Sequence, residues 1–445
     1  MRENILGKDP IHKLFLTYTL PSVAAMLFLG LNTIVDGLFV GNYIGASALA
    51  SVNIAMPFSS FVIALSIMIG IGGQSLIGRH LGAGQIPEAQ TAFKTAVLLI
   101  VGSSLLFASG AVLFSEEIAR CLGANAPILE QTAVYICYSG LFLPFLSVML
   151  VLDYALKTIG RPIYAMIALI IAVSSHMGLT WLLVGQLALG LKGAALAMGI
   201  ACIVAFILAA LPFSSKKSPL NFFQGSFDRQ TALHILYGGS AEGLTEIGTG
   251  VTTFLFNITL MRYVGETGVA AFTVISYLSF IGNNVLIGLS DGVGAIISYN
   301  YGYKKAARVK KALKLACITA FSIGIGLFLI FFVFSKEIVS IFLAADNEKV
   351  LHLAHYGAKI YAFAFLANGL NIIFSGYFTA IGQPKNAALI SLSKGFLWIA
   401  AGIVLLPALL GIRGIWLTVP LAEAATIVLS IALLHRHFTD PLRLK

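Results

Sequence analysis

The stretch TAVLLIVGSSLLFASGAVLF, residues 95–114, contains no charged side chain. At 1.5 Å per residue a helix of this length spans about 30 Å, the thickness of the hydrocarbon core of a bilayer. Apolar runs of similar length recur from one end of the chain to the other. The sequence therefore predicts an α-helical membrane protein, with no large soluble domain.

The composition supports this interpretation. The 445 residues are 58% hydrophobic and only 10% charged, whereas soluble domains carry about 25% charged residues. The first apolar run, 14–40, is too long for a signal peptide and lacks a small-residue cleavage site, so we expect it to be the first span. The four cysteines are scattered and show no metal-binding or disulfide spacing.

Polar, glycine- or proline-containing stretches divide the chain into twelve predicted spans. Several exceed the roughly 20 residues that a bilayer needs, which predicts tilted or bent helices. The expected spans are 12–40, 46–77, 91–114, 128–153, 163–186, 192–213, 232–262, 267–297, 312–335, 350–381, 386–410 and 413–435.

The basic residues predict the orientation. With the N-terminus inside, twenty of the 28 Lys and Arg residues fall on the inner connections and tails, and six fall outside. The positive-inside rule then places both termini in the cytoplasm of a plasma-membrane protein. The net charge of +10 follows from this distribution and does not indicate a nucleic-acid partner. The run from Lys304 to Lys314 could contact acidic lipid headgroups.

The two halves of the chain resemble each other at an offset of 220 to 222 residues. Matched pairs include Tyr43-Ile-Gly45 with Tyr263-Val-Gly265, Gly72 with Gly292, Gly82 with Gly302, Ile159-Gly-Arg-Pro162 with Ile381-Gly-Gln-Pro384, and Gly190-Leu-Lys-Gly193 with Gly411-Ile-Arg-Gly414. Six spans per half is an even number, so both halves share one orientation, as in a parallel repeat. We expect twelve transmembrane helices in two pseudo-symmetric six-helix lobes, 1–213 and 232–445, joined by a polar cytoplasmic linker, 214–231.

Several motifs fall in register with a known transporter family. The segments NTIVDGLFVGNYIGASALASVNIAMP (32–57), SLIGRHLGAGQIPEA (75–89), GLKGAALAMGIA (190–201), EIGTGVTTFLFN (246–257) and SDGVGAIISYNYGYKKAARVKKALK (290–314) together sample nearly the whole chain. The sequence thereby resembles the multidrug and toxic compound extrusion (MATE) family, and its MepA/DinF-like bacterial branch in particular.

The resemblance implies a secondary antiporter. A lipophilic, usually cationic organic compound would leave the cell while protons, or alternatively sodium ions, enter. No further cofactor, metal or nucleic acid is implied, and we expect a monomer among membrane lipids. The family does not name the substrate.

Asp36 is the first candidate for ion coupling. Counted from Leu14, it lies about 33 Å along its helix, toward the outer part of the membrane. Charged groups in spans cost at least about 2.5 kcal/mol near the bilayer centre, so they indicate function by default. Screening from water favours the neutral form of a carboxyl group, which can then carry a proton. The resemblance adds that the matching aspartate is associated with coupling; the alternative is a structural hydrogen bond.

His176 and Thr180 stand where many family members carry an Asn and an Asp four residues apart. The spacing keeps both on one helix face, but the second carboxylate is missing here. Imidazole is a poor sodium ligand and titrates near neutral pH, which favours proton coupling over sodium coupling. A hydrogen-bonded structural role for His176 stays open.

Glu242 and Glu246 share a helix face, and Glu246 is expected about 18–20 Å from the cytoplasmic start of its span. Facing a cavity, they would attract an organic cation; paired with Lys394 or Lys359, they would be structural. Three further polar residues within second-lobe spans are predicted to line the cavity: Glu423, Asn257 and Asn283. The alternative for Glu423 is pairing with Lys394, and for the two asparagines interhelical hydrogen bonding is an equal alternative.

Other functions fit less well. A lipid-linked saccharide flippase of the same superfamily would be expected to carry several cationic cavity residues, and the spans here carry carboxylates instead. A channel would show a selectivity filter or rings of charge. The sequence contains no HExxH or Walker A motif, so we do not expect an enzyme or direct use of ATP.

Overall fold

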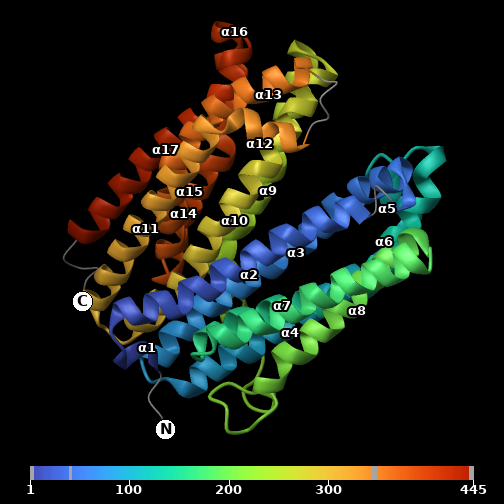
Figure 1. Ribbon diagram of the computed structural model, residues 1–445. Coiled ribbons are helices and arrows are strands. Elements are labelled where there is room, and N and C mark those ends of the chain that lie inside the picture. The colour runs from blue at the N-terminus through green and yellow to red at the C-terminus, as the bar shows by residue number, and fades with distance from the viewer. Residues whose placement is uncertain (1–4, 40–42, 343–347, 440–445) are drawn as a thin grey trace. The chain divides into compact units, whose positions relative to one another are not determined.

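The computed structural model describes residues 5–39, 43–342 and 348–439, and every regular element in these ranges is a helix (Figure 1). The first half contains α1 (Ile5–Lys8), α2 (Ile11–Phe39), α3 (Ala46–Gly82), α4 (Ile86–Leu113), α5 (Ser115–Cys121), α6 (Ala126–Thr158), α7 (Pro162–Thr180) and α8 (Gly190–Ala210). The second half contains α9 (Arg229–Tyr263), α10 (Glu266–Gly302), α11 (Ala306–Val333), α12 (Ser335–Phe342), α13 (Glu348–Tyr361), α14 (Phe365–Ala380), α15 (Pro384–Leu392), α16 (Trp398–Leu410) and α17 (Ile412–Thr439).

These helices confirm the predicted all-helical membrane fold. Eleven helical segments of the described residues are long and apolar enough to cross a bilayer. The remaining long helix, α9, has 35 residues; it is less apolar because Glu242, Glu246 and several threonines lie within it. A 35-residue helix measures about 52 Å, so length does not prevent α9 from crossing a bilayer. With α9, the described chain has the twelve expected long segments.

Backbone conformation repeats between the halves at the predicted offset. Gly160 and Gly382 have φ values of 87° and 76°. Each lies just after the end of a helix and two residues before a proline, Pro162 or Pro384. The amide of Arg161 donates to Leu156 O at 2.9 Å, and that of Gln383 donates to Phe378 O at 2.8 Å. Positive φ strains residues with a Cβ, which explains glycine at both turns. Proline at the first position of the next helix completes each corner.

The described residues form two compact units. Of the described residues, unit 1 comprises 5–9, 20–39, 43–239 and 298–304, and unit 2 comprises 10–19, 240–297, 305–342 and 348–439. Helices α2, α9 and α10 therefore contribute to both units. The lobe boundaries expected at 213 and 232 remain a prediction.

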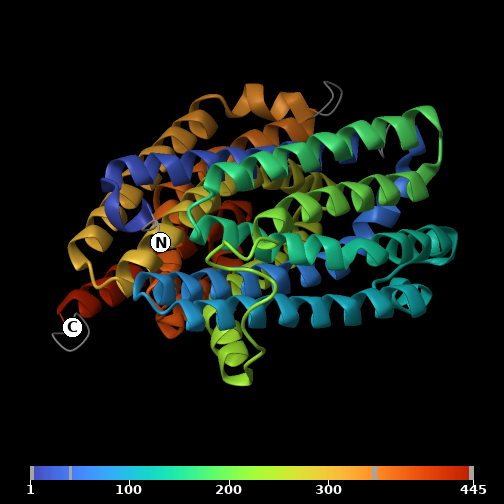
Figure 2. The ribbon, with the colours of Figure 1, turned by 90° about the horizontal axis from the view of Figure 1, so that it is seen from below.

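In unit 1, α6 packs against α3, α4 and α8, and α7 packs against α8. Figure 2 shows α4, α6, α7 and α8 running lengthwise beside one another. A turn of π-helix at Trp181–Gln186 follows α7 directly. Many of the buried positions on α8 are alanine or glycine, which allows close helix packing in a membrane.

In unit 2, α11 packs against α14, and α17 packs against α14 and α16. Its apolar core is centred on Phe256, Phe272 and Trp416, which are at most 5% exposed. The rings of Phe256 and Phe272 stack with centroids 4.7 Å apart. A second π-helical turn at Ser393–Leu397 joins α15 to α16, and it carries Lys394.

The connection between α8 and α9 is fastened to unit 1. We call residues 221–228 the strap (Figure 2). Gln90 of α4 donates to Asn221 O and to Gln224 O at 3.0 Å, and its side-chain oxygen accepts from Asn221 N at 2.9 Å. Lys94 donates to Phe222 O at 2.7 Å. The predicted polar linker is thus an ordered segment along α4.

The end of α10 also packs tightly in unit 1, against the end of α3. A Cβ placed on Gly302 would lie 2.0 Å from Arg79 O, and one placed on Gly82 would lie 2.0 Å from Tyr299 O. Because no real Cβ approaches so closely, both crossings require glycine. Gly82 and Gly302 are matched residues of the sequence repeat, so each half supplies one of the two close contacts.

Candidate functional site

Three helices place polar side chains together in unit 1. Asp36 lies in the last turn of α2, and Asn32 lies one turn earlier on the same helix. His176 and Thr180 occupy the last turn of α7, immediately before the π-helical turn. Tyr135 of α6 is close enough to be influenced by the charge of Asp36.

The two titratable groups face each other. His176 Nε2 lies 3.7 Å from Asp36 Oδ1, and His176 Nδ1 lies 2.9 Å from Asn32 Oδ1. The side chains of His176 and Asp36 are 8% and 27% exposed. Within the described residues, Asp36 Oδ1, His176 Nε2 and Thr180 Oγ1 are buried atoms without a hydrogen-bond partner. Buried polar atoms normally have hydrogen-bond partners. The cluster can therefore accept an additional proton or a bound ligand.

The hydrogen-bond pattern leaves room for one proton. An amide oxygen only accepts, so His176 Nδ1 is the donor toward Asn32 Oδ1. A neutral imidazole then presents a lone pair at Nε2, facing the carboxylate oxygen of Asp36. Two acceptors 3.7 Å apart make no hydrogen bond. A proton on either group would turn this contact into a charge-assisted or neutral hydrogen bond.

The structure thus brings Asp36, His176 and Thr180 into one region of unit 1, as their residue types suggested. Asn32 was missed in the sequence analysis, although its spacing of four residues from Asp36 puts both on one helix face. Asn32 orients the imidazole, and it thereby decides which nitrogen faces the carboxylate.

Unit 2 contains a second polar network. Lys394 Nζ lies 3.3 Å from Glu423 Oε1 and donates to Asn368 Oδ1 at 2.6 Å. Asn368 in turn donates to Asn283 Oδ1 at 2.5 Å. Asn371 donates to Glu423 Oε2 at 2.8 Å. The ion pair and these hydrogen bonds together link α10, α14, α17 and the π-helical turn.

The remaining predicted cavity residues lie on α9. Glu242 is half-buried and Glu246 is exposed; Glu242 is near enough to Lys394 and Asp291 to be influenced by their charges. The partner of Lys394 in the structure is Glu423, while Lys359 lies over the Phe332 ring at 5.8 Å. Asn257 is half-buried, and no hydrogen bond among the described residues joins it to the network around Lys394.

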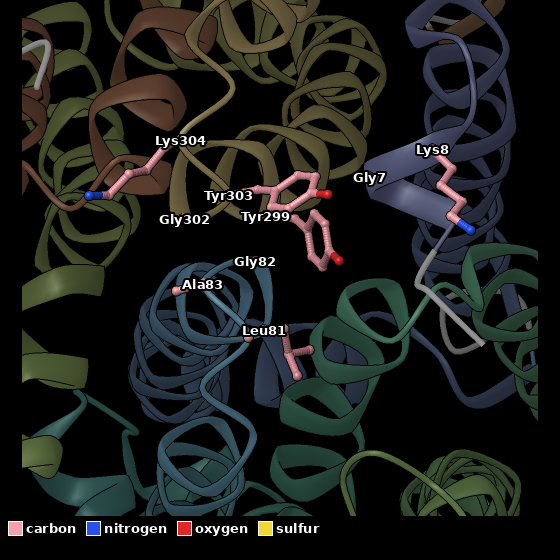
Figure 3. Close-up of a pocket in the computed structure, with 10 residues that line it drawn as sticks. Gly7, Lys8, Leu81, Gly82, Ala83, Tyr299, Gly302, Tyr303 and Lys304 are labelled. Carbon is pink, nitrogen blue, oxygen red and sulfur yellow. The ribbon is translucent and has the colours of Figure 1, made fainter. Parts of the chain in front are cut away.

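A cavity of about 390 Å³ lies elsewhere in unit 1, at the ends of α1, α3 and α10 (Figure 3). It is lined by Gly7, Lys8, Leu81, Gly82, Ala83, Gly84, Tyr299, Gly302, Tyr303 and Lys304. None of the candidate coupling residues lines it. Among the described residues no group of three His, Cys, Asp or Glu side chains is arranged to hold a metal ion.

Comparisons with known proteins agree with this architecture. The family model described as MatE matches residues 21–182 and again residues 243–404. The second matched segment begins 222 residues after the first, which confirms the internal duplication.

Two curated relatives and one solved structure extend the match over nearly the whole chain. The multidrug export protein MepA of Staphylococcus haemolyticus is 25% identical over 96% of this chain and 94% of its own. MepA of Staphylococcus saprophyticus is 26% identical over 94% of this chain and 92% of its own. The crystal structure of a MATE protein in complex with MaL6 superimposes with a TM-score of 0.92 at 18% identity, covering 98% of each chain.

Proposed function

Because this chain belongs to the MatE family, we propose that it is a secondary antiporter that exports small lipophilic organic cations in exchange for protons. Its many apolar helices and its family make it an integral membrane protein. Transport of several drugs is suggested by the name of the relatives, which are multidrug export proteins.

The observation that carries the choice of ion is the contact between His176 Nε2 and Asp36 Oδ1. In the neutral imidazole and ionised carboxylate forms, the two atoms face each other as acceptors, 3.7 Å apart. A single proton between His176 Nε2 and Asp36 Oδ1 would give both atoms a hydrogen-bond partner, and no other ligand is needed. Charges held out of water interact strongly, so taking up or losing this proton changes how firmly α2 and α7 are held together. We infer that this change couples the proton gradient to the transport cycle.

The second candidate ion is sodium. Asp36, Asn32 and Thr180 each provide an oxygen in this region, and oxygen atoms are the ligands of hard cations. The imidazole nitrogens of His176 favour the proton, since one of them is directed at the carboxylate. A structural sodium site would need the ring to turn away from Asp36.

The cationic preference of the substrate is proposed from the acidic residues of α9. Glu246 is exposed and Glu242 is half-buried, within a helix that is otherwise rich in apolar and threonine side chains. Glu423 is the less suitable carboxylate, because Lys394 and Asn371 already hold it. A cationic ligand would therefore be attracted mainly by the pair on α9.

The test is transport in proteoliposomes. An imposed pH step should drive ethidium transport, and Asp36→Asn should abolish the pH-driven part. His176→Gln, which keeps a hydrogen-bonding group but cannot carry the proton, should reduce it strongly. Glu116→Gln is the matched control, since Glu116 lies in the same unit but pairs with Arg120 at an exposed site.

Different results would separate the alternatives. Transport that is driven by a sodium step at clamped pH would replace the proton assignment with sodium. Undiminished pH-driven transport in Asp36→Asn would remove Asp36 from the mechanism. For the substrate, Glu242→Gln with Glu246→Gln should raise KM for ethidium and leave the transport of a neutral dye unchanged; equal effects on both dyes would contradict the cationic preference.

A further inference from the structure

The cavity at the ends of α1, α3 and α10 combines basic and hydroxyl groups. Lys8 and Lys304 lie on opposite sides of the rings of Tyr299 and Tyr303, and in this view their ammonium groups are directed away from the rings (Figure 3). None of its ten lining residues is acidic. Its volume of about 390 Å³ lies within the usual range of about 300–1,000 Å³ for small-ligand pockets.

The cavity is built by matched segments of the two halves, which differ in chemistry. Residues 81–84 of the first half correspond to residues 301–304 of the second half at the offset of 220. Ala83 thereby corresponds to Tyr303, and Gly84 corresponds to Lys304. The second half has added a hydroxyl and a positive charge where the first half has almost no side chain.

Lys304 holds a backbone conformation that suits glycine better. Its φ is 56°, close to the 75° of Gly84 in the first half. A side chain with a Cβ is strained in this region, and such strain tends to be found at functional sites. Glycine can form this turn without strain, as Gly84 does at the matching position of the first half. The side chain of Lys304 therefore has a reason to be present other than the turn.

The α1 side of the cavity is fixed in place. Asn300 Nδ2 donates to Leu6 O at 3.1 Å, which ties α1 to α10. A Cβ on Gly7 would lie 3.2 Å from Tyr299 Cε1, so the ring packs directly on the backbone of α1. A bound anion would draw the two lysine side chains inward by rotation about their methylene groups, with no movement of the helices.

We propose that this cavity binds a phosphate group, as carried by the headgroup of an anionic phospholipid or by a soluble phosphate compound. Lysine ammonium groups and tyrosine hydroxyls are donors that suit phosphate oxygens. Lys8 and Lys304 supply the charge, and Tyr299 and Tyr303 supply hydrogen bonds on the face between them. This site is independent of proton coupling and of the exported substrate.

The experiment uses the full-length protein in detergent micelles, with lipid binding followed by native mass spectrometry. The wild type should bind phosphatidylglycerol more tightly than phosphatidylcholine. Lys304→Gly installs the residue of the first half, so it should fold at least as well as the wild type. It should nevertheless bind phosphatidylglycerol about tenfold more weakly, the effect of losing one charge-assisted hydrogen bond. Tyr303→Ala, which copies Ala83, should also weaken binding.

Lys311→Ala is the matched control, because Lys311 is an exposed lysine of the same basic run and does not line the cavity. It should bind phosphatidylglycerol like the wild type. Thermal unfolding without lipid verifies that each variant is folded.

Inorganic phosphate distinguishes the two sources. If inorganic phosphate displaces the lipid, the site recognises phosphate from either source. If inorganic phosphate alone raises the melting temperature of the wild type but not of Lys304→Gly, the site binds a soluble phosphate compound. Lipid binding that phosphate does not displace, but that Lys304→Gly weakens, assigns the headgroup. Equal binding of the two lipids together with no effect of phosphate would overturn the proposal, as would wild-type binding by Lys304→Gly or an equal loss in Lys311→Ala.

Discussion

Replacing Lys394 with methionine would leave a buried carboxylate without its cation. Lys394 Nζ lies 3.3 Å from Glu423 Oε1, and the two side chains are 22% and 6% exposed. Methionine keeps most of the aliphatic length of lysine, so the change removes the charge and the hydrogen bond to Asn368 while filling most of the same space.

The expected loss can be worked from this geometry. At 3.3 Å and an effective dielectric constant of about 20, two unit charges attract by about 5 kcal/mol. The cost of removing both charges from water offsets much of this attraction. Breaking one partner of a buried pair costs about 3–5 kcal/mol, and the partial exposure of Lys394 favours the lower end. We expect Lys394→Met to lower the free energy of unfolding by about 3 kcal/mol.

A double-mutant cycle measures this interaction. Unfolding by denaturant in mixed micelles would be compared for the wild type, Lys394→Met, Glu423→Gln and the double variant. The double variant should recover at least about 1 kcal/mol relative to Lys394→Met, because it leaves no unpaired charge. Lys359→Met is the control: its ammonium lies over the Phe332 ring, and its loss should cost about 0.5–1 kcal/mol. Equal stability of Lys394→Met and Lys359→Met, with no recovery in the double variant, would refute the reasoning.

Three other changes test single contacts. Gly302→Ala should destabilise the protein by about 1–3 kcal/mol or prevent folding, since the new Cβ would lie 2.0 Å from Arg79 O; thermal unfolding measures this. Asp228→Ala should lower the melting temperature at pH 7. Hydrogen bonds from Thr231 lower the pKa of Asp228 from that of an ordinary aspartate, so its stabilisation is fully present above the pKa of the unfolded chain and is lost as the pH falls through the folded-state pKa. Gln90→Ala should speed tryptic cleavage before the strap, because three hydrogen bonds to the strap are lost.

Each of these predictions has a control. Gly326→Ala should change stability little, because nothing lies within 4 Å of a Cβ at that position. For Asp228, the difference in melting temperature between wild type and variant should narrow on acidification; a constant difference from neutral to acidic pH would contradict the titration. For Gln90, unchanged cleavage at Lys216 and Lys217, which are exposed, would mean that the strap is held by other contacts.

The helices and the duplication could be predicted from the sequence because both depend on local or periodic information. Runs such as 95–114 predict a membrane helix from hydrophobicity alone. The corners at Gly160 and Gly382 could be matched because both contain the same Gly-X-Pro pattern, and both adopt positive φ. Hydrophobicity predicts α9 as a membrane helix least clearly, because its acidic and threonine residues make it less apolar.

The details of the sites could be predicted only in part. Residue type and position singled out Asp36 and His176, and the structure places them 3.7 Å apart. Which carboxylate would pair with Lys394 depended on how α17 packs against the π-helical turn, and helix periodicity does not contain that information. The cavity beside Lys304 depends on the close crossing of α3 and α10, so its lining could not be assembled from separate motifs.

The hydrogen bonds of the strap determine where the chain can be divided into two fragments that still assemble. Residues up to Ser226 are held by α4, whereas Asp228 caps the start of α9 through the Thr231 amide and also donates its own amide to Thr95 Oγ1 of α4 at 3.1 Å. A chain break between Ser226 and Asp228 would leave the hydrogen bonds of Gln90 and Lys94 within one fragment and would divide the contact of Asp228 with Thr95 between the two. Two co-expressed polypeptides divided at Phe227 should therefore reassemble, while a break nearer Asn221 would separate Gln90 from its partners and should reduce the yield of assembled transporter.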